Sequence, residues 1–131
     1  MVGERVFLDT SVILSWIKKS SKEADRIIND PDITRFINGY VLKEVYWVLN
    51  HQQGFSEQQI RDAVEDISNL CTILPTPSKE EFMKIRIRDK SDRPMVCSAL
   101  KYNLVLLIDD EKTYRDAKKY VKVKRISKNG D

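Results

Sequence analysis

The sequence has few of the residues that build disulfide frameworks, zinc sites or histidine-based catalysis. Its 131 residues contain two cysteines, Cys71 and Cys97, and one histidine, His51. Neither cysteine has a second cysteine or a histidine at metal-ligand spacing, so both are predicted to be buried structural thiols, which suits a reducing cytoplasm. The single histidine lies at the end of a predicted helix, where a surface position is expected. A chain with one histidine cannot catalyse RNA cleavage by a pair of histidines.

Long hydrophobic runs, repeats and linkers are also missing. The amino terminus has no basic segment followed by a long apolar run, and no stretch approaches the length that spans a bilayer. We therefore expect no signal peptide, no membrane contact and a cytoplasmic protein. Because no Pro/Gly-rich or low-complexity segment divides the chain, residues 1–131 are predicted to form a single domain.

Charge is plentiful but nearly balanced. Charged residues make up 33% of the sequence and hydrophobic residues 41%, as in a globular domain with a heavily charged surface. The formal net charge of +3 permits a polyanionic partner without requiring one.

The stretch from residue 5 to residue 14 has the pattern of a buried strand, a tight turn and a helix start. The apolar run 6–8 ends at Asp9, and either Thr10 or Ser11 can cap the helix that follows. Asp9 then lies at the carboxyl end of a strand, the edge at which open α/β sheets bind ligands. Asp9 could itself be the cap, but we assign capping to Thr10 or Ser11, which leaves the Asp9 carboxylate free.

Strand-like and helix-like segments alternate along the rest of the chain. Segment 84–88 suits a strand or a helix, and the capping-box pattern at 78–81 favours the helix. The alternation predicts a three-layer α/β/α sandwich around a mostly parallel, five-stranded sheet. Strands are predicted at 6–8, 36–37, 72–74, 104–108 and, as an edge strand, 121–126; the longer helices are predicted at 40–51, 56–70, 92–102 and 111–120.

Four acids are predicted to meet at one edge of this sheet. Asp9 and Asp110 follow strands, whereas Glu44 and Asp92 lie in the first turns of helices. Helix amino termini and strand carboxyl ends share an edge in this architecture, although Glu44 alone could also be a solvated border residue. Gathered carboxylates repel one another unless a cation neutralises them, and hard divalent ions such as Mg²⁺ prefer carboxylate oxygens. Such a site suits metal-assisted phosphoryl chemistry.

Segments 7–13, 41–45, 92–100 and 106–110 resemble the ordered motifs of PIN domains, which in prokaryotes include the VapC-type toxin ribonucleases of VapBC toxin–antitoxin pairs. The resemblance covers essentially the whole chain. It implies a five-stranded parallel sheet, Mg²⁺- or Mn²⁺-dependent endonuclease activity on RNA, frequent homodimers and inhibition by a small antitoxin. It also implies roles for single residues: the four acids Asp9, Glu44, Asp92 and Asp110 match the family's catalytic, metal-binding positions, and the polar residues that orient the first acid match Thr10 and Ser11.

One position departs from the family pattern. A Thr or Ser is common two places before the last acid, and here Ile108 stands in that place. A hydrogen bond to Asp110 is therefore expected to be missing. The adjacent Asp109 could then substitute for Asp110.

Basic residues near Asp92 are candidates for contacts to RNA phosphates. The same charge run would also suit a solvated face. The candidates are Arg88, Lys90 and Arg93, with Lys84 and Arg86 before them.

Two other functions fit the same fold. The chain could be a housekeeping RNA-processing PIN nuclease, or a non-catalytic PIN-like binding module in which Ile108 is a sign of erosion. Two further folds with acidic pockets are disfavoured. A receiver domain needs its phosphoacceptor Asp in mid-chain and a second acid beside the one after the first strand, where Thr10 stands. A haloacid-dehalogenase-type phosphatase needs Asp in place of Ser11.

Trp47 points away from the apolar stripe of its predicted helix, which indicates a covered surface such as a dimer face.

Overall fold

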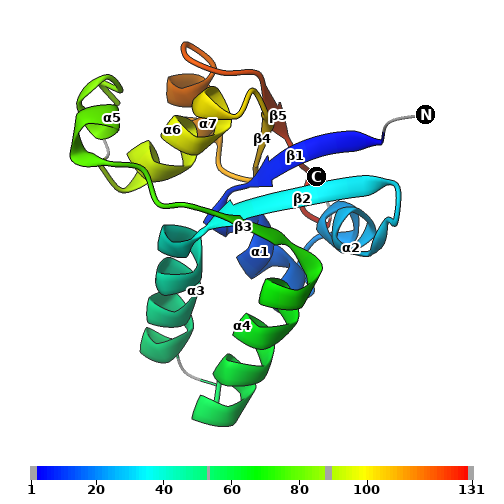
Figure 1. Ribbon diagram of the computed structural model, residues 1–131. Helices are drawn as coiled ribbons and strands as arrows, with labels where there is room; N and C mark the ends of the chain where they lie inside the picture. Colours follow the sequence, from blue (N-terminus) through cyan, green and yellow to red (C-terminus); the bar gives the residue numbers. More distant parts are fainter. Residues whose placement is uncertain (1–2, 53, 88–89, 130–131) are drawn as a thin grey trace.

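The computed structural model describes residues 3–52, 54–87 and 90–129 and places a five-stranded sheet between two layers of helices (Figure 1). In chain order the elements are β1 (Glu4–Leu8), α1 (Thr10–Ile17), α2 (Lys22–Asn29), β2 (Ile33–Asn38), α3 (Gly39–His51), α4 (Glu57–Leu70), β3 (Thr72–Leu74), α5 (Lys79–Met83), the 3-10 helix η1 (Lys90–Asp92), α6 (Arg93–Lys101), β4 (Val105–Ile108), α7 (Glu111–Ala117) and β5 (Val123–Arg125).

The strands run in the order β3-β2-β1-β4-β5, and every pair is parallel. The sequence predicted a mostly parallel sheet, and the sheet is entirely parallel. The central strand is β1, so the chain order reverses on its two sides. Open parallel sheets bind ligands at such a switch point, beyond the carboxyl ends of the strands. Asp9 directly follows β1 and therefore lies at this point.

The apolar runs of β1 and β4 form the centre of the core because both of their faces are covered. Helices α1, α3 and α4 lie on one side of the sheet and α5, α6 and α7 on the other (Figure 1). Residues 6–8 and 106–108 are at most 2% exposed. Burying each such side chain contributes about 1.5–3 kcal/mol to stability. The acids at the carboxyl ends of the strands therefore directly follow a well-packed core.

The helix predicted through segment 84–88 is wrong for residues 84–87, the part of this segment that the structure describes. Helix α5 ends at Met83, and residues 85–87 have no regular secondary structure. Ile85 and Ile87 are both buried while Arg86 between them is exposed, a spacing of two that a helix cannot satisfy. Burial of the two isoleucines therefore overrides the upstream capping box. The predicted edge strand near the carboxyl end is confirmed as β5, and α7 is three residues shorter than predicted.

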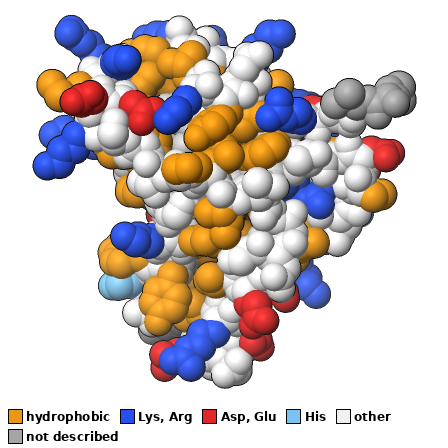
Figure 2. Space-filling view, viewed as in Figure 1, with side chains coloured by type: hydrophobic (Ala, Val, Ile, Leu, Met, Phe, Trp, Pro, Cys, Tyr) orange, Lys and Arg blue, Asp and Glu red, His pale blue; other side chains and the backbone are white. Residues whose placement is uncertain are grey.

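None of the helices in the described part of the chain is both long and apolar enough to cross a membrane. His51 lies at the exposed end of α3, as predicted, and its ring stacks on Trp47 with 4.1 Å between the ring centroids. Trp47 is 60% exposed, and hydrophobic side chains gather beside the histidine on the surface (Figure 2).

Candidate metal centre

Asp9 caps α1 with one oxygen and leaves the other without a partner. Its Oδ2 accepts hydrogen bonds from the Ser11 backbone N–H at 3.0 Å and from the Ser11 hydroxyl at 2.6 Å. Its Oδ1 is buried and accepts no hydrogen bond from any described residue. The assignment of capping to Thr10 or Ser11 is therefore wrong, because Asp9 is itself the cap. Capping and ligand binding are nevertheless compatible, since they use different oxygens of one carboxylate.

The two residues after Asp9 differ in what they do. The Ser11 hydroxyl donates to Asp9 and also accepts a hydrogen bond from the Asp109 backbone N–H at 3.0 Å, so it joins the ends of β1 and β4. The Thr10 hydroxyl is buried and makes no hydrogen bond within the described residues. Of the two predicted orienting residues, Ser11 is the one that contacts the Asp9 carboxylate.

Thr113 brings Asp110 close to Asp92. The Asp110 carboxylate caps α7 by accepting hydrogen bonds from the Thr113 backbone N–H at 2.9 Å and from its hydroxyl at 2.6 Å. The same hydroxyl lies 3.3 Å from Oδ2 of Asp92. These hydrogen bonds from Thr113 are the main reason that the pKa of Asp110 is lowered. Thr113 thus supplies the hydroxyl that Ile108 lacks; the signal for it in the sequence is the cap spacing Asp-x-x-Thr.

Asp109 is turned to a different set of partners. Its carboxylate accepts a hydrogen bond from the Ser15 hydroxyl on α1 and lies 3.8 Å from the Lys128 ammonium. Because these contacts occupy it, Asp110 rather than Asp109 remains the candidate ligand.

Electrostatics link Asp9 to acids from two other elements. The pKa of Asp9 is raised to about 6, chiefly by burial and also by the negative charges of Glu44 and Asp110, while the hydrogen bonds from Ser11 oppose the rise. Glu44 lies on α3 and is half-buried. The charges of Glu44 and Asp110 thus act on the buried carboxylate of Asp9.

The fit of this region to a divalent cation rests on Oδ1 of Asp9. A buried carboxylate oxygen with no protein donor is costly unless something outside the chain neutralises it. Among the described residues, no group of three Asp, Glu, His or Cys side chains is close enough together to form a complete set of metal ligands. Mg²⁺ commonly takes only one or two protein carboxylates and keeps several waters, so the donors present suit such an ion.

Asn38, which the sequence did not single out, fixes α3, which carries Glu44, to α6, which directly follows Asp92. It is fully buried at the end of β2. Its side-chain oxygen accepts from the Val41 N–H at 3.1 Å and caps α3. Its side-chain nitrogen donates to the Pro94 carbonyl at 3.1 Å and to the Ser98 hydroxyl at 2.9 Å, both on α6. The amide therefore locks the amino-terminal turns of α3 and α6 together.

The predicted phosphate-binding residues fare differently. Lys90 is exposed in η1, two residues before Asp92. The Arg93 guanidinium donates to the Ile87 carbonyl at 3.2 and 3.3 Å, so it holds the preceding segment in place. Arg88 lies outside the described residues.

The comparisons with known proteins decide the family. A family model described as the PIN domain matches residues 6–119. The chain belongs to the PIN domain family. No curated protein sequence matches it.

Solved structures agree with this assignment at the level of the fold. DNA-bound VapBC from Salmonella typhimurium matches with a TM-score of 0.75 at 14% identity, over 93% of this chain and 98% of that one. VapBC-1 from nontypeable Haemophilus influenzae matches with a TM-score of 0.69 at 22% identity, over 92% and 97%. VapBC-5 from Mycobacterium tuberculosis, a member of the VapBC family of toxin–antitoxin systems, matches with 0.64 at 18%, over 94% and 98%. The resemblance to PIN domains of VapBC complexes is therefore confirmed.

The role of Thr113 in this PIN domain is open to a direct test. Thr113→Val removes the hydroxyl but keeps the backbone N–H, so Asp110 loses its 2.6 Å hydrogen bond. Loss of a partner that orients a metal ligand typically costs 10–100-fold in affinity, and we expect about that loss of Mn²⁺ affinity by calorimetry. Thr113→Ser keeps the hydroxyl and should bind as the parent does. Equal affinities for the valine and serine variants would contradict this role.

Proposed function

We propose that this PIN domain is a metal-dependent endoribonuclease that hydrolyses RNA phosphodiester bonds. The observation that carries the proposal is the buried Oδ1 of Asp9, which has no donor among the described residues and lies near Glu44 and Asp110. The PIN fold, which typically belongs to nucleases, supports the reaction class.

The catalytic residues are Asp9, Glu44, Asp92 and Asp110. Asp9, Asp92 and Asp110 would hold Mg²⁺ or Mn²⁺ directly or through water, and Glu44 through water or on a second ion. When bound, the ion supplies a water of lowered pKa and offsets charge on the leaving oxygen. Ser11 keeps one oxygen of Asp9 fixed by two hydrogen bonds. Thr113 does the same for Asp110. The chain thus holds its carboxylates in place before any substrate arrives.

The test of the proposal is cleavage of labelled RNA by the purified protein. Cleavage with Mn²⁺ and its loss with EDTA are expected, together with a specific Mn²⁺ isotherm in calorimetry. A protein that neither binds Mn²⁺ specifically nor cuts RNA would instead be a non-catalytic binding module.

We further propose that the chain is the toxin of a toxin–antitoxin pair and that its protein partner is a small antitoxin. Three solved structures with this fold are VapBC complexes, one of them described as part of a toxin–antitoxin system. Induction of the chain in cells should arrest growth, and co-expression of the neighbouring gene's product should relieve the arrest. A housekeeping RNA-processing nuclease would cut RNA without arresting growth.

A homodimer is part of the same proposal. Trp47 and Tyr46 are exposed on α3, by 60% and 40% respectively, and an exposed aromatic patch is a common feature of protein interfaces. Analytical ultracentrifugation of the parent and of Trp47→Ser tests it, because the substitution should weaken the dimer.

A further inference from the structure

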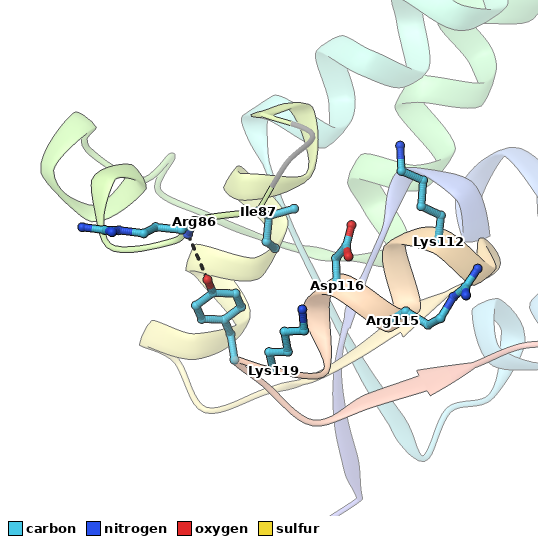
Figure 3. Close-up of a pocket in the computed structure, with 7 residues that line it drawn as sticks. Arg86, Ile87, Lys112, Arg115, Asp116 and Lys119 are labelled. Carbon is cyan, nitrogen blue, oxygen red and sulfur yellow. Dashed lines mark hydrogen bonds between the residues drawn. The ribbon is translucent and has the colours of Figure 1, made fainter.

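An open hollow of about 470 Å³ lies between α7 and the segment 86–87 (Figure 3). Four basic side chains line it, Arg86, Lys112, Arg115 and Lys119, and the carboxylate that lines it with them is Asp116. Their local excess of positive charge equals the net +3 of the whole chain. So much charge of one sign in a concave surface attracts anions.

The hollow is built into the fold by hydrogen bonds that fix its wall. The Arg86 backbone N–H donates to the Tyr120 hydroxyl at 3.1 Å, which ties the segment to the end of α7 (Figure 3). On the other side, the Ile87 carbonyl accepts two hydrogen bonds from the Arg93 guanidinium. The segment is therefore held between α6 and α7, and the position of Arg86 is set by the backbone.

The basic groups form a row instead of converging on one point. In Figure 3, Arg86 extends from one end, Lys112 and Arg115 lie at the other end, and Lys119 lies between them. A single small anion needs donors aimed at one position, whereas an extended polyanion needs charges spread along its path. Arg115 also contacts Glu111, at 3.7 Å, but both side chains are more than half exposed, so this pair is weak and leaves Arg115 available.

The row leads to the proposed metal centre. Lys112 lies in the first turn of α7, two residues after the cap Asp110, and Arg93, which anchors the wall, follows Asp92. A cluster of carboxylates repels a polyanionic substrate, and an adjacent row of cations offsets that repulsion.

We propose that this hollow binds the phosphate backbone of a single-stranded RNA, on one side of the bond that is cut. The assignment rests on the proposed ribonuclease function. It keeps Arg86 from the predicted phosphate contacts and moves the others from the Arg88–Arg93 region to α7. Phosphate contacts of this kind position a strand without reading its sequence.

The experiment measures binding of a labelled single-stranded oligouridine in EDTA, across a range of salt concentrations. The test variant combines Arg86→Gln, Arg115→Gln and Lys119→Gln and spares Lys112 because of its closeness to Asp110. A matched control removes three exposed charges from α2 and α4 through Lys22→Gln, Arg26→Gln and Arg61→Gln. Each phosphate contact to a single strand contributes about 0.7 to the slope of log K against log salt, so the test variant should lose about 2 units and the control none.

The outcomes separate this inference from the nuclease proposal. If the parent cuts RNA with Mn²⁺ but the parent, test variant and control share one slope, the hollow is not the RNA site and the nuclease assignment stands. If the slope falls only in the test variant while no protein cuts RNA, the hollow is confirmed as an RNA-binding site and the nuclease assignment is wrong. Displacement of the RNA by an oligoglutamate of equal charge at equal concentration would overturn the choice of RNA as the ligand. Equal melting temperatures of test variant and control confirm that both are folded.

Discussion

Replacing Asp9 by asparagine is expected to abolish RNA cleavage and to stabilise the metal-free protein. Asparagine keeps an oxygen that can cap α1 through the Ser11 N–H, so the local structure should survive. It removes the negative charge of the proposed ligand. Loss of one group that stabilises transition-state charge typically costs 10²–10³ in rate, and we expect a fall of at least about 100-fold in cleavage with Mn²⁺.

The gain in stability follows from the pKa of Asp9. Burial raises this pKa from 3.8 to about 6 in the folded protein, so the folded state holds the proton more tightly than the unfolded state does. The metal-free parent should therefore lose stability as the pH rises from about 4 to about 6, by about 3 kcal/mol for a shift of this size. Asp9→Asn has no titrating carboxyl group at this position. Its free energy of unfolding should therefore fall by about 3 kcal/mol less than that of the parent over the same pH range.

Urea unfolding in EDTA across this pH range measures the difference. Asp66→Asn, which removes an exposed carboxylate from α4, is the matched control and should behave as the parent does. Mn²⁺ should stabilise the parent more than Asp9→Asn. If parent and Asp9→Asn lose stability in parallel, Asp9 is not a carboxylate held at an energetic cost, and the ligand assignment loses its main support.

The sequence predicted the sheet well because the strands are recognisable locally. The run at 104–108 is uninterrupted and apolar, which is the pattern of a strand covered on both faces, and β4 occupies 105–108. Once strands and helices alternate, the parallel topology places Asp9 and Asp110 at one edge. That step needs only the order of the elements, and the parallel pairing of β1 with β4 agrees with it.

The parts that the sequence missed depend on contacts between distant residues. Asn38 reads as a turn residue until α6, more than fifty positions later, supplies its partners. The choice between Asp9, Thr10 and Ser11 as the cap of α1 depends on rotamers that the Asp109 backbone helps to fix through Ser11. The conformation of residues 84–87 follows the burial of Ile85 and Ile87 instead of the local capping signal. In each case a tertiary contact outweighs a local preference of about 1 kcal/mol.

The second large effect is expected from Asn38→Ala. The substitution leaves the Val41 N–H, the Pro94 carbonyl and the Ser98 hydroxyl without their partner in a fully buried place. Each buried polar group left unsatisfied costs about 1–3 kcal/mol, so we expect a loss of about 3–5 kcal/mol in the free energy of unfolding. Asn29→Ala is the matched control, because Asn29 also makes side-chain hydrogen bonds, to Asp25, but is exposed and should lose less than about 1 kcal/mol.

Cleavage by Asn38→Ala tests whether the amide also positions the acids. Measured well below the melting temperature, where the variant is folded, its kcat should still fall, because α3 and α6 carry or adjoin Glu44 and Asp92 and no longer share a fixed contact. A variant that is less stable but cuts RNA at the parent's rate when folded would make Asn38 a purely structural residue. A fall in both stability and kcat, with Asn29→Ala unchanged in both, would show that one buried amide at the end of β2 sets the geometry of acids on two helices.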